Sequence, residues 1–237
     1  MANWGGRSWK TGIGLAGGLI ALFVTGCAVL EVARLNNRDL TELEVDGSRL
    51  YMAHEVNSRT LDQFLAVVAE HPEIDTLVLT IVPGSVDDEV NLALGRKVRQ
   101  LGLDTHLVGG GMIASGGVDL FLAGVERKIE KGAFVGVHSW ASGVAMKGDQ
   151  LDRDHPDHRL YLDYYRDLGT PEDFYWFTLE AAPSRGMHWM TAAELERFQV
   201  VTQPVVEPGG EPTPFDAAID ELGRELEGDS DRPTPVE

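Results

Sequence analysis

The sequence predicts a single α/β domain in which helices flank a mainly parallel sheet. Strand-like and helical segments alternate along the chain between about residues 42 and 206. One of them, residues 76–82 (TLVLTIV), is a continuous apolar run, as expected for a strand that is covered on both faces. The alternation gives the order βαβαβ, and strands that are joined by helical crossovers run parallel to each other.

Each element is predicted from its turn residues and its apolar period. Asp46-Gly47 separates two short apolar segments, which favours a hairpin. His71-Pro72 ends the first helical pattern, because proline cannot continue a helix. After the hairpin, the predicted elements are a helix over 61–68, the strand 76–82, a helix over 87–101, a strand over 106–108, the glycine run 109–111, a buried helix over 118–122 and a strand over 134–138.

The beginning of the chain predicts export from the cytosol. Arg7 and Lys10 precede an apolar stretch over residues 13–24, which is the pattern of a signal peptide over residues 1–26. Small residues then precede Cys27, and this arrangement resembles the lipobox of bacterial lipoproteins. We therefore expect lipid on Cys27.

An uncleaved spanning helix is the alternative, because apolar residues continue to about residue 30 and approach the ~20 that a bilayer crossing needs. In both cases residues 27–41 form a tether. We expect the domain to be attached to a membrane of the bacterial cell envelope and to face the periplasm or the exterior.

Composition excludes several classes of protein. Cleavage after residue 26 leaves 237 − 26 = 211 residues with a formal charge of 18 − 38 = −20, because Arg7 and Lys10 are removed. Such a surface repels phosphate backbones, so we expect no nucleic-acid partner. A single cysteine excludes an internal disulfide and a thiolate zinc site. Residues 207–237 read as an acidic tail rich in proline and glycine, with a possible short helix.

Three segments carry a resemblance to a known family. They are Pro83-Gly84-Ser85 after the buried strand, Ile113-Ala114-Ser115-Gly116-Gly117 at a helix start, and Gly132-Ala133-Phe134-Val135-Gly136-Val137-His138. In this order they resemble the oxyanion turn, the nucleophile segment and the histidine strand of the Clp protease proteolytic subunit and its crotonase-like relatives, including bacterial periplasmic Clp-like proteins. The resemblance covers about residues 42–203. It implies a superhelical domain of repeated ββα units, a peptide or ester substrate, and a homo-oligomer.

The residue types suit acyl transfer. A serine hydroxyl becomes a good nucleophile when an imidazole takes its proton, so Ser115 is the predicted nucleophile and His138 the predicted base. A helix that starts just after Ser115 aims free amides at a developing oxyanion, and the predicted donors are the amides of Ser85 and Gly116. No cofactor is expected. The alternative interpretation of Ser115 is a helix N-cap.

The resemblance fails at the third catalytic position. Aligned on the family, Met187 stands where the proteases carry the aspartate that orients the histidine, and methionine cannot do this. Candidate substitutes are Asp152, Asp154 and Asp163. The second interpretation of the chain is therefore a catalytically silent envelope protein that binds peptides or acts as a scaffold.

Two further clusters are expected to be structural. His155 and His158 lie among acids, but Pro156 favours a loop and no third ligand is identifiable, so we expect no metal. Seven aromatic residues lie on two helices on either side of Gly169-Thr170-Pro171, where we expect core packing, with some rings lining a cleft or a subunit contact. They are Tyr161, Tyr164, Tyr165, Phe174, Tyr175, Trp176 and Phe177.

Overall fold

The computed structural model describes residues 40–142, 146–227 and 233–237. The predicted signal peptide, Cys27 and nearly all of the predicted tether lie outside these residues. Within the described residues, no helix is both long and apolar enough to cross a membrane.

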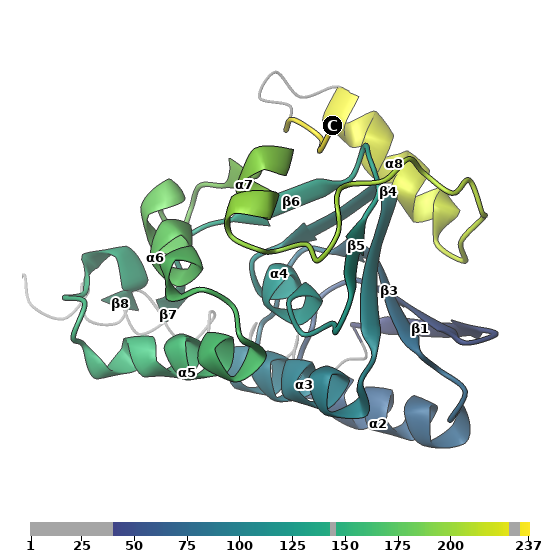
Figure 1. Cartoon of the computed structure of the whole chain (residues 1–237), viewed down its shortest axis with the longest axis horizontal. Coiled ribbons are helices and arrows are strands. Elements are labelled where there is room, and N and C mark those ends of the chain that lie inside the picture. Colours follow the sequence, from purple (N-terminus) through teal and green to yellow (C-terminus); the bar gives the residue numbers. More distant parts are fainter. Residues whose placement is uncertain (1–39, 143–145, 228–232) are drawn as a thin grey trace, which may run out of the picture.

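A seven-stranded sheet organises the domain (Figure 1). Its strand order is β1-β2-β3-β4-β6-β9, and β5 pairs with β4. The elements are β1 (Glu42–Asp46), β2 (Arg49–Ala53), α2 (Thr60–Glu70), β3 (Thr76–Val82), α3 (Asp88–Leu101), β4 (Asp104–Ala114), α4 (Gly116–Phe121), β5 (Arg127–Ile129), β6 (Phe134–Val137), β7 (Ala141–Ser142), β8 (Met146–Lys147), η1 (Gly148–Gln150), η2 (Pro156–His158), α5 (Arg159–Leu168), α6 (Glu172–Ala181), β9 (His188–Trp189), α7 (Ala192–Arg197) and α8 (Asp216–Glu227).

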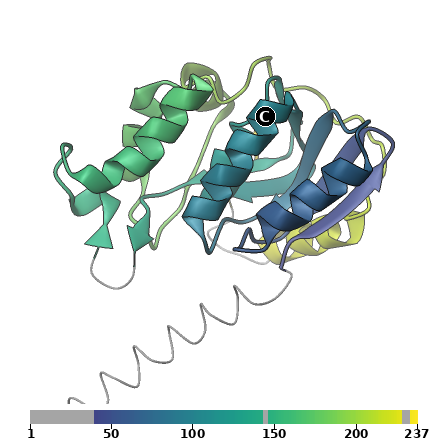
Figure 2. The ribbon, with the colours of Figure 1, turned by 90° about the horizontal axis from the view of Figure 1, so that it is seen from below.

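The predicted α/β class is confirmed. Strands β2, β3, β4 and β6 run parallel, while the hairpin strand β1 and the edge strand β9 are antiparallel to their neighbours. Helices α2, α3 and α5 lie side by side (Figure 2), and α2, α3 and α4 cover one face of the sheet over the main core. Helix α8 packs on the opposite face, which explains why β3 is apolar along its whole length.

Strand β4 is longer than the sequence pattern predicted. Its first part pairs with β3 and β5, its last part pairs with β3 and β6, and between the two parts the register against β3 shifts. The glycine run 109–111 lies in this irregular stretch. A Cβ on Gly111 would lie 2.5 Å from the carbonyl oxygen of Thr80, so the close approach of the two strands requires glycine there. These glycines therefore shape the strand.

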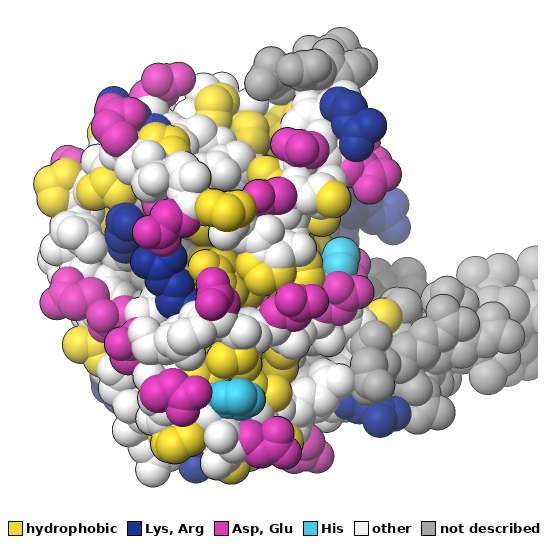
Figure 3. Space-filling view, turned by 90° about the vertical axis from the view of Figure 1, so that its right-hand side faces the viewer, with side chains coloured by type: hydrophobic (Ala, Val, Ile, Leu, Met, Phe, Trp, Pro, Cys, Tyr) yellow, Lys and Arg dark blue, Asp and Glu magenta, His cyan; other side chains and the backbone are white. Residues whose placement is uncertain are grey.

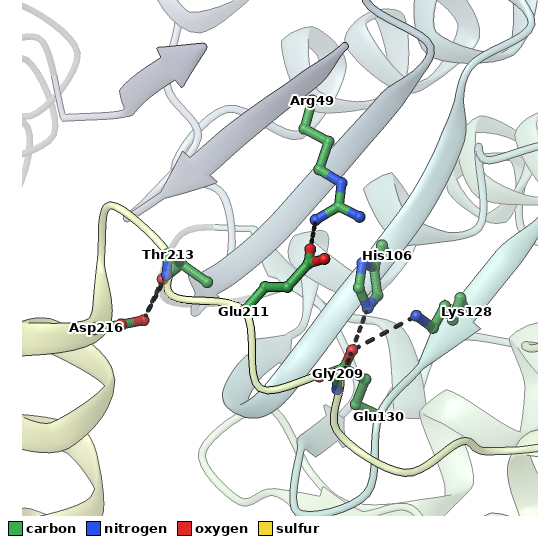
Figure 4. A network of polar contacts seen from close by, with 8 residues as sticks. All are labelled: Arg49, His106, Lys128, Glu130, Gly209, Glu211, Thr213 and Asp216. Carbon is green, nitrogen blue, oxygen red and sulfur yellow. Dashed lines mark hydrogen bonds and ion pairs between the residues drawn. The ribbon is translucent and has the colours of Figure 1, made fainter. Parts of the chain in front are cut away.

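The C-terminal segment is fastened across the sheet by charged side chains (Figure 4). Glu130 is nearly buried, accepts hydrogen bonds from the amides of Gly109 and Gly209, and accepts a third from His106 Nε2 at 3.0 Å. Arg49 pairs with Glu211 at 2.5 Å. The segment that composition marks as a tail is thus held to β2, β4 and the strand end after β5.

The same segment also adds to the core. Phe215 packs against Tyr51, Val78 and Val108 on the face away from α2 and α3, and Val236 is buried beside residues 132–133. The many acidic, proline and glycine residues of the tail thus surround a few apolar ones that dock.

The acidic surface expected from composition is visible in Figure 3, where acidic side chains spread over the face that is drawn.

Helices α3 and α5 are in contact through a glycine. A Cβ on Gly95 would lie 2.0 Å from the hydroxyl oxygen of Tyr164. Tyr164 is fully buried and donates a hydrogen bond to the carbonyl oxygen of Asp119 at 2.7 Å, so its ring has little room to move. Gly95 therefore sets the distance between the two helices.

We expect Gly95→Ala to lower the free energy of unfolding by about 2 kcal/mol, because overpacking outweighs the gain in helix propensity. The matched control is Gly223→Ala in α8, where a Cβ has no neighbour within 4 Å. The control should leave stability unchanged or raise it by up to about 1 kcal/mol. Urea unfolding of both variants measures the difference, and equal effects would contradict the packing interpretation.

Candidate active site

The predicted nucleophile lies in an unusual backbone conformation. Ser115 joins the end of β4 to the start of α4 at φ 50° and ψ −126°, which a non-glycine residue rarely adopts. Its amide donates to the carbonyl oxygen of Gly136 on β6 at 3.0 Å. Such strain persists only where the surrounding structure holds it, and it is concentrated at functional sites.

The Ser115 hydroxyl does not cap helix α4. No side-chain capping bond is present at this helix start, and Ser115 Oγ has no hydrogen-bond partner within the described residues. The N-cap interpretation therefore does not account for the side chain. The hydroxyl is available for another role.

Two backbone amides next to Ser115 are also available. Ser85 follows β3 and Gly116 begins α4, and a Cβ on Gly116 would lie 2.6 Å from Ser85 Oγ, so the two turns are in contact. Within the described residues, neither amide donates a hydrogen bond to another protein group. Asn91 Nδ2 donates to the Gly116 carbonyl oxygen at 2.8 Å and fixes this peptide. Two free amides at adjoining turns can stabilise an oxyanion.

His138 follows β6 and has one defined ring partner. Its Nδ1 lies 2.8 Å from the carbonyl oxygen of Ser139, and because a carbonyl only accepts, Nδ1 carries the proton. Neutral His138 therefore has its lone pair on Nε2, which is the form that a general base needs.

Ser139 is itself held firmly. Its amide donates to the carbonyl oxygen of Ala182 at 2.8 Å, and its hydroxyl accepts from the amide of Asp149 at 2.9 Å. Ser139 is fully buried. The carbonyl that orients His138 is therefore fixed by two long-range contacts.

The four predicted residues line one cavity of about 200 Å³. Ser115, His138, Ser85 and Gly116 all contribute to its wall. No hydrogen bond joins Ser115 to His138 in the described part of the chain. Hydrogen bonds between catalytic groups are often long in unliganded sites and tighten when substrate binds.

The structure brings none of the three predicted orienting acids to His138. Asp163 pairs with Arg166 on the surface of α5 at 2.8 Å. Asp152 and Asp154 are exposed, and the backbone carbonyl of Asp152 accepts from His158 Nε2 at 3.1 Å. These acids follow His138 closely in sequence, but the chain between them folds away into η1 and η2.

Met187 lies beside the histidine strand. In the antiparallel pairing of β6 with β9, Val137 is opposite His188, so continuing the register by one residue places Met187 opposite His138. A Cβ on Gly136 would lie 2.6 Å from the sulfur of Met187. The position that the resemblance assigns to the acid is thus next to His138, but its side chain is apolar.

The clustered histidines have structural partners. His158 is buried, its Nε2 donates to the carbonyl oxygen of Asp152, and its Nδ1 accepts from the Tyr175 hydroxyl at 2.6 Å. Trp140 Nε1 donates to the same Tyr175 oxygen at 2.8 Å. His155 Nδ1 accepts from the amide of Asp157. Both histidines therefore fix the loop before α5.

Two acids in the cavity were not predicted. Asp88 begins α3 and accepts from Ser85 Oγ at 2.5 Å and from the Tyr161 hydroxyl at 2.6 Å. Asp119 lies on α4 and accepts from the Tyr165 hydroxyl at 2.5 Å. A sequence signal did exist, because Asp119 lies in the first turn of the helix that opens directly after Ser115.

The predicted aromatic cluster divides into two parts. Tyr161, Tyr165, Phe174 and Tyr175 line the cavity. Tyr164 packs in the core between α3 and α5, and Phe177 stacks on Phe198 with ring centroids 4.4 Å apart. The cluster thus both packs the helices and forms one wall of the site.

Burial gives Asp119 an unusual proton affinity. Burial raises the pKa of Asp119 to about 7, the hydrogen bond from Tyr165 opposes this rise, and the charge of Asp88 adds to it. Burial also raises the pKa of Tyr165 well above its ordinary value, so the phenol stays a donor. Asp119 therefore changes charge near neutral pH.

Comparisons with known proteins add a likeness to solved structures. No family model matches the sequence, and a search of curated proteins gives no match. Among solved structures, the chain is similar to an alanine mutant of the 1510-N membrane-bound stomatin-specific protease in complex with a substrate peptide. That likeness has 15% sequence identity and a TM-score of 0.45, and it covers 66% of this chain and 72% of the other.

We expect the free energy of unfolding to fall as pH rises from about 4 to about 7. In this window the folded chain holds a proton on Asp119 that the unfolded chain, with a pKa near 3.8, has released. About three pKa units correspond to an effect on the order of 4 kcal/mol.

Urea unfolding between pH 4 and pH 8 tests this. Asp119→Asn should remove this part of the pH dependence, because the amide does not titrate. Tyr165→Phe should extend it to higher pH, because the hydrogen bond that opposes the rise in the pKa is lost. Parallel pH profiles for the wild type and Asp119→Asn would show that Asp119 does not titrate in this range.

Proposed function

We propose that the chain is an ATP-independent serine hydrolase of the cell envelope, and that it acts as a peptidase. Ser115 is the nucleophile, Nε2 of His138 is the general base, and the amides of Ser85 and Gly116 form the oxyanion hole. The observation that carries the proposal is that the Ser115 hydroxyl lies in a strained turn and does not cap helix α4. It lines a cavity that it shares with a correctly protonated histidine.

In the proposed reaction, Ser115 Oγ attacks the carbonyl carbon of the substrate while His138 Nε2 takes its proton. The carbonyl oxygen becomes an oxyanion that accepts from the two amides. His138 then donates the proton to the leaving group as the acyl-enzyme forms, and water repeats the sequence to release the acid. The carbonyl of Ser139 replaces the usual carboxylate as the acceptor for His138 Nδ1.

Orienting His138 by the carbonyl of Ser139 has a chemical consequence. A neutral carbonyl stabilises the imidazolium that forms during attack less than a carboxylate does, because it carries no full charge. We therefore expect turnover to be slower than in a Ser-His-Asp site. The tautomer is still the productive one.

The first test is covalent labelling of the full chain with a fluorophosphonate probe. We expect labelling at Ser115, and Ser115→Ala should abolish it. His138→Gln should slow it by roughly 10²–10⁴-fold, the usual contribution of a general base. Ser184→Ala is the matched control, since Ser184 lines the same cavity and should not be required.

The labelling experiment also distinguishes the hydrolase from a catalytically silent protein. If the probe never modifies Ser115 between pH 6 and pH 9 while the chain is folded, the hydrolase proposal fails. A catalytically silent protein that binds peptides or forms a scaffold would then be favoured. The apolar side chain of Met187, at the position where the resemblance places the orienting acid, motivates this second candidate.

A substitution at Cys27 tests how the chain is attached to the envelope. If Cys27 is lipidated, the chain is cleaved before it, and Cys27→Ala should block both cleavage and incorporation of labelled palmitate. If residues 11–30 simply span the membrane, Cys27→Ala should leave the chain uncleaved and membrane-bound, as in the wild type. Mass spectrometry of the N-terminus and membrane fractionation distinguish these outcomes. A wild-type chain found only in the cytosol would overturn the envelope proposal.

A further inference from the structure

The cavity beside Ser115 is lined by two carboxylates and, within the described residues, by neither lysine nor arginine. The two carboxylates are those of Asp88 and Asp119. Over the described residues, neither acid forms an ion pair with a basic side chain. A buried carboxylate without a counter-ion is unfavourable, so a cation that entered the cavity would be stabilised.

One carboxylate oxygen is open to the cavity. Asp119 is only 9% exposed, and the Tyr165 hydroxyl occupies its Oδ1. Its Oδ2 accepts no hydrogen bond within the described residues. This oxygen is not fully buried, so it keeps some accessible surface. When Asp119 is ionised, this oxygen can accept a hydrogen bond from a donor that enters the cavity.

The second carboxylate is held in place by hydroxyl groups. Asp88 accepts from Ser85 Oγ and from the Tyr161 hydroxyl. These bonds fix its position next to the proposed oxyanion turn. The two acids are close enough for the charge of Asp88 to raise the pKa of Asp119, although burial is the larger cause. A single positive charge between them would remove this repulsion.

The remaining wall is aromatic. Trp140 stacks on Tyr161, and Tyr161 stacks on Tyr175, with ring centroids 5.9 and 5.8 Å apart. Rings of this kind suit the methylene stem of a long side chain and also attract a cation. The volume, about 200 Å³, is below the ~300–1,000 Å³ of typical small-molecule sites, so it matches one side chain.

We infer that this cavity is a specificity pocket for a cationic side chain, the lysine or arginine of a peptide substrate, adjacent to the bond that Ser115 attacks. Asp119 Oδ2 and Asp88 are the counter-ions, and the stacked rings hold the methylene stem. The inference rests on the proposed function and names its substrate class. Anionic substrates are disfavoured at the same place.

The test compares two peptide substrates that differ only in charge. The full chain, in mild detergent, is given acetyl-Ala-Ala-Lys-aminomethylcoumarin or its norleucine counterpart, whose side chain has the same four-carbon stem without the amine. A charged hydrogen bond contributes about 1.5–3 kcal/mol, so kcat/KM for the lysine substrate should be roughly 10–150-fold higher. Asp119→Asn and Asp88→Asn should each reduce this ratio toward one.

Two controls keep the result specific. Asp173→Asn removes an acid from the exposed surface of α6, next to the cavity residue Phe174, and should leave the ratio unchanged. Thermal unfolding of every variant confirms that it is folded. If Asp119→Asn does not fold, Asp88→Asn alone decides, because its carboxylate lines the same pocket.

A binding measurement separates the two proposals. Ser115→Ala is titrated with fluorescein-labelled peptides that carry lysine or norleucine, and tighter lysine binding that is lost in Ser115→Ala/Asp119→Asn supports the pocket even if no hydrolysis occurs. If the wild type hydrolyses both substrates equally well, the pocket inference is overturned and the hydrolase proposal stands. Equal binding of both peptides to Ser115→Ala, in a chain that hydrolyses neither, overturns the inference as well.

Discussion

The close approach of helix α4 to the end of strand β3 is the constraint on which the candidate site depends. A Cβ on Gly117 would lie 2.2 Å from the carbonyl oxygen of Val82, so only glycine allows this contact. The contact forces a sharp turn at Ser115 and brings Gly116 against Ser85. The same turn is tied to β6, which ends one residue before His138. The backbone therefore assembles the nucleophile, the base and the amide donors together.

The resemblance carried by three short segments, together with the strand and helix patterns, predicted this backbone framework but not the charges that surround it. Ser115, His138, Ser85 and Gly116 follow strand ends or open a helix, and parallel strands bring such positions to one edge of the sheet. Asp88 and Asp119 are acids in the first turns of helices, where the helix dipole ordinarily stabilises a negative charge. Their role in the cavity depends on tyrosines of α5, about 45 to 73 residues away in sequence, and no local pattern encodes that packing.

The possible short helix predicted in the tail is present as α8, although the average composition of the tail does not show that it docks. Proline, glycine and acidic residues dominate residues 207–237, so their average suggests a solvated segment. Burial depends on individual positions: Phe215 and Val236 are buried, Glu130 accepts from the amide of Gly209, and Arg49 pairs with the side chain of Glu211. The opposite holds for the acids that were expected to orient His138: they are near it in sequence, but the fold does not bring them into contact with it.

The fastening of the C-terminal segment sets the order in which the chain can fold. The pair of Arg49 and Glu211 closes a loop of 162 residues, and Gly209 reaches Glu130 over 79. Contacts of such long range carry a large loop-closure entropy and form late. Until they form, Tyr51, Val78 and Val108 leave an apolar stripe of the sheet exposed. On a newly made chain this apolar stripe therefore stays uncovered until Phe215 and α8 dock on it.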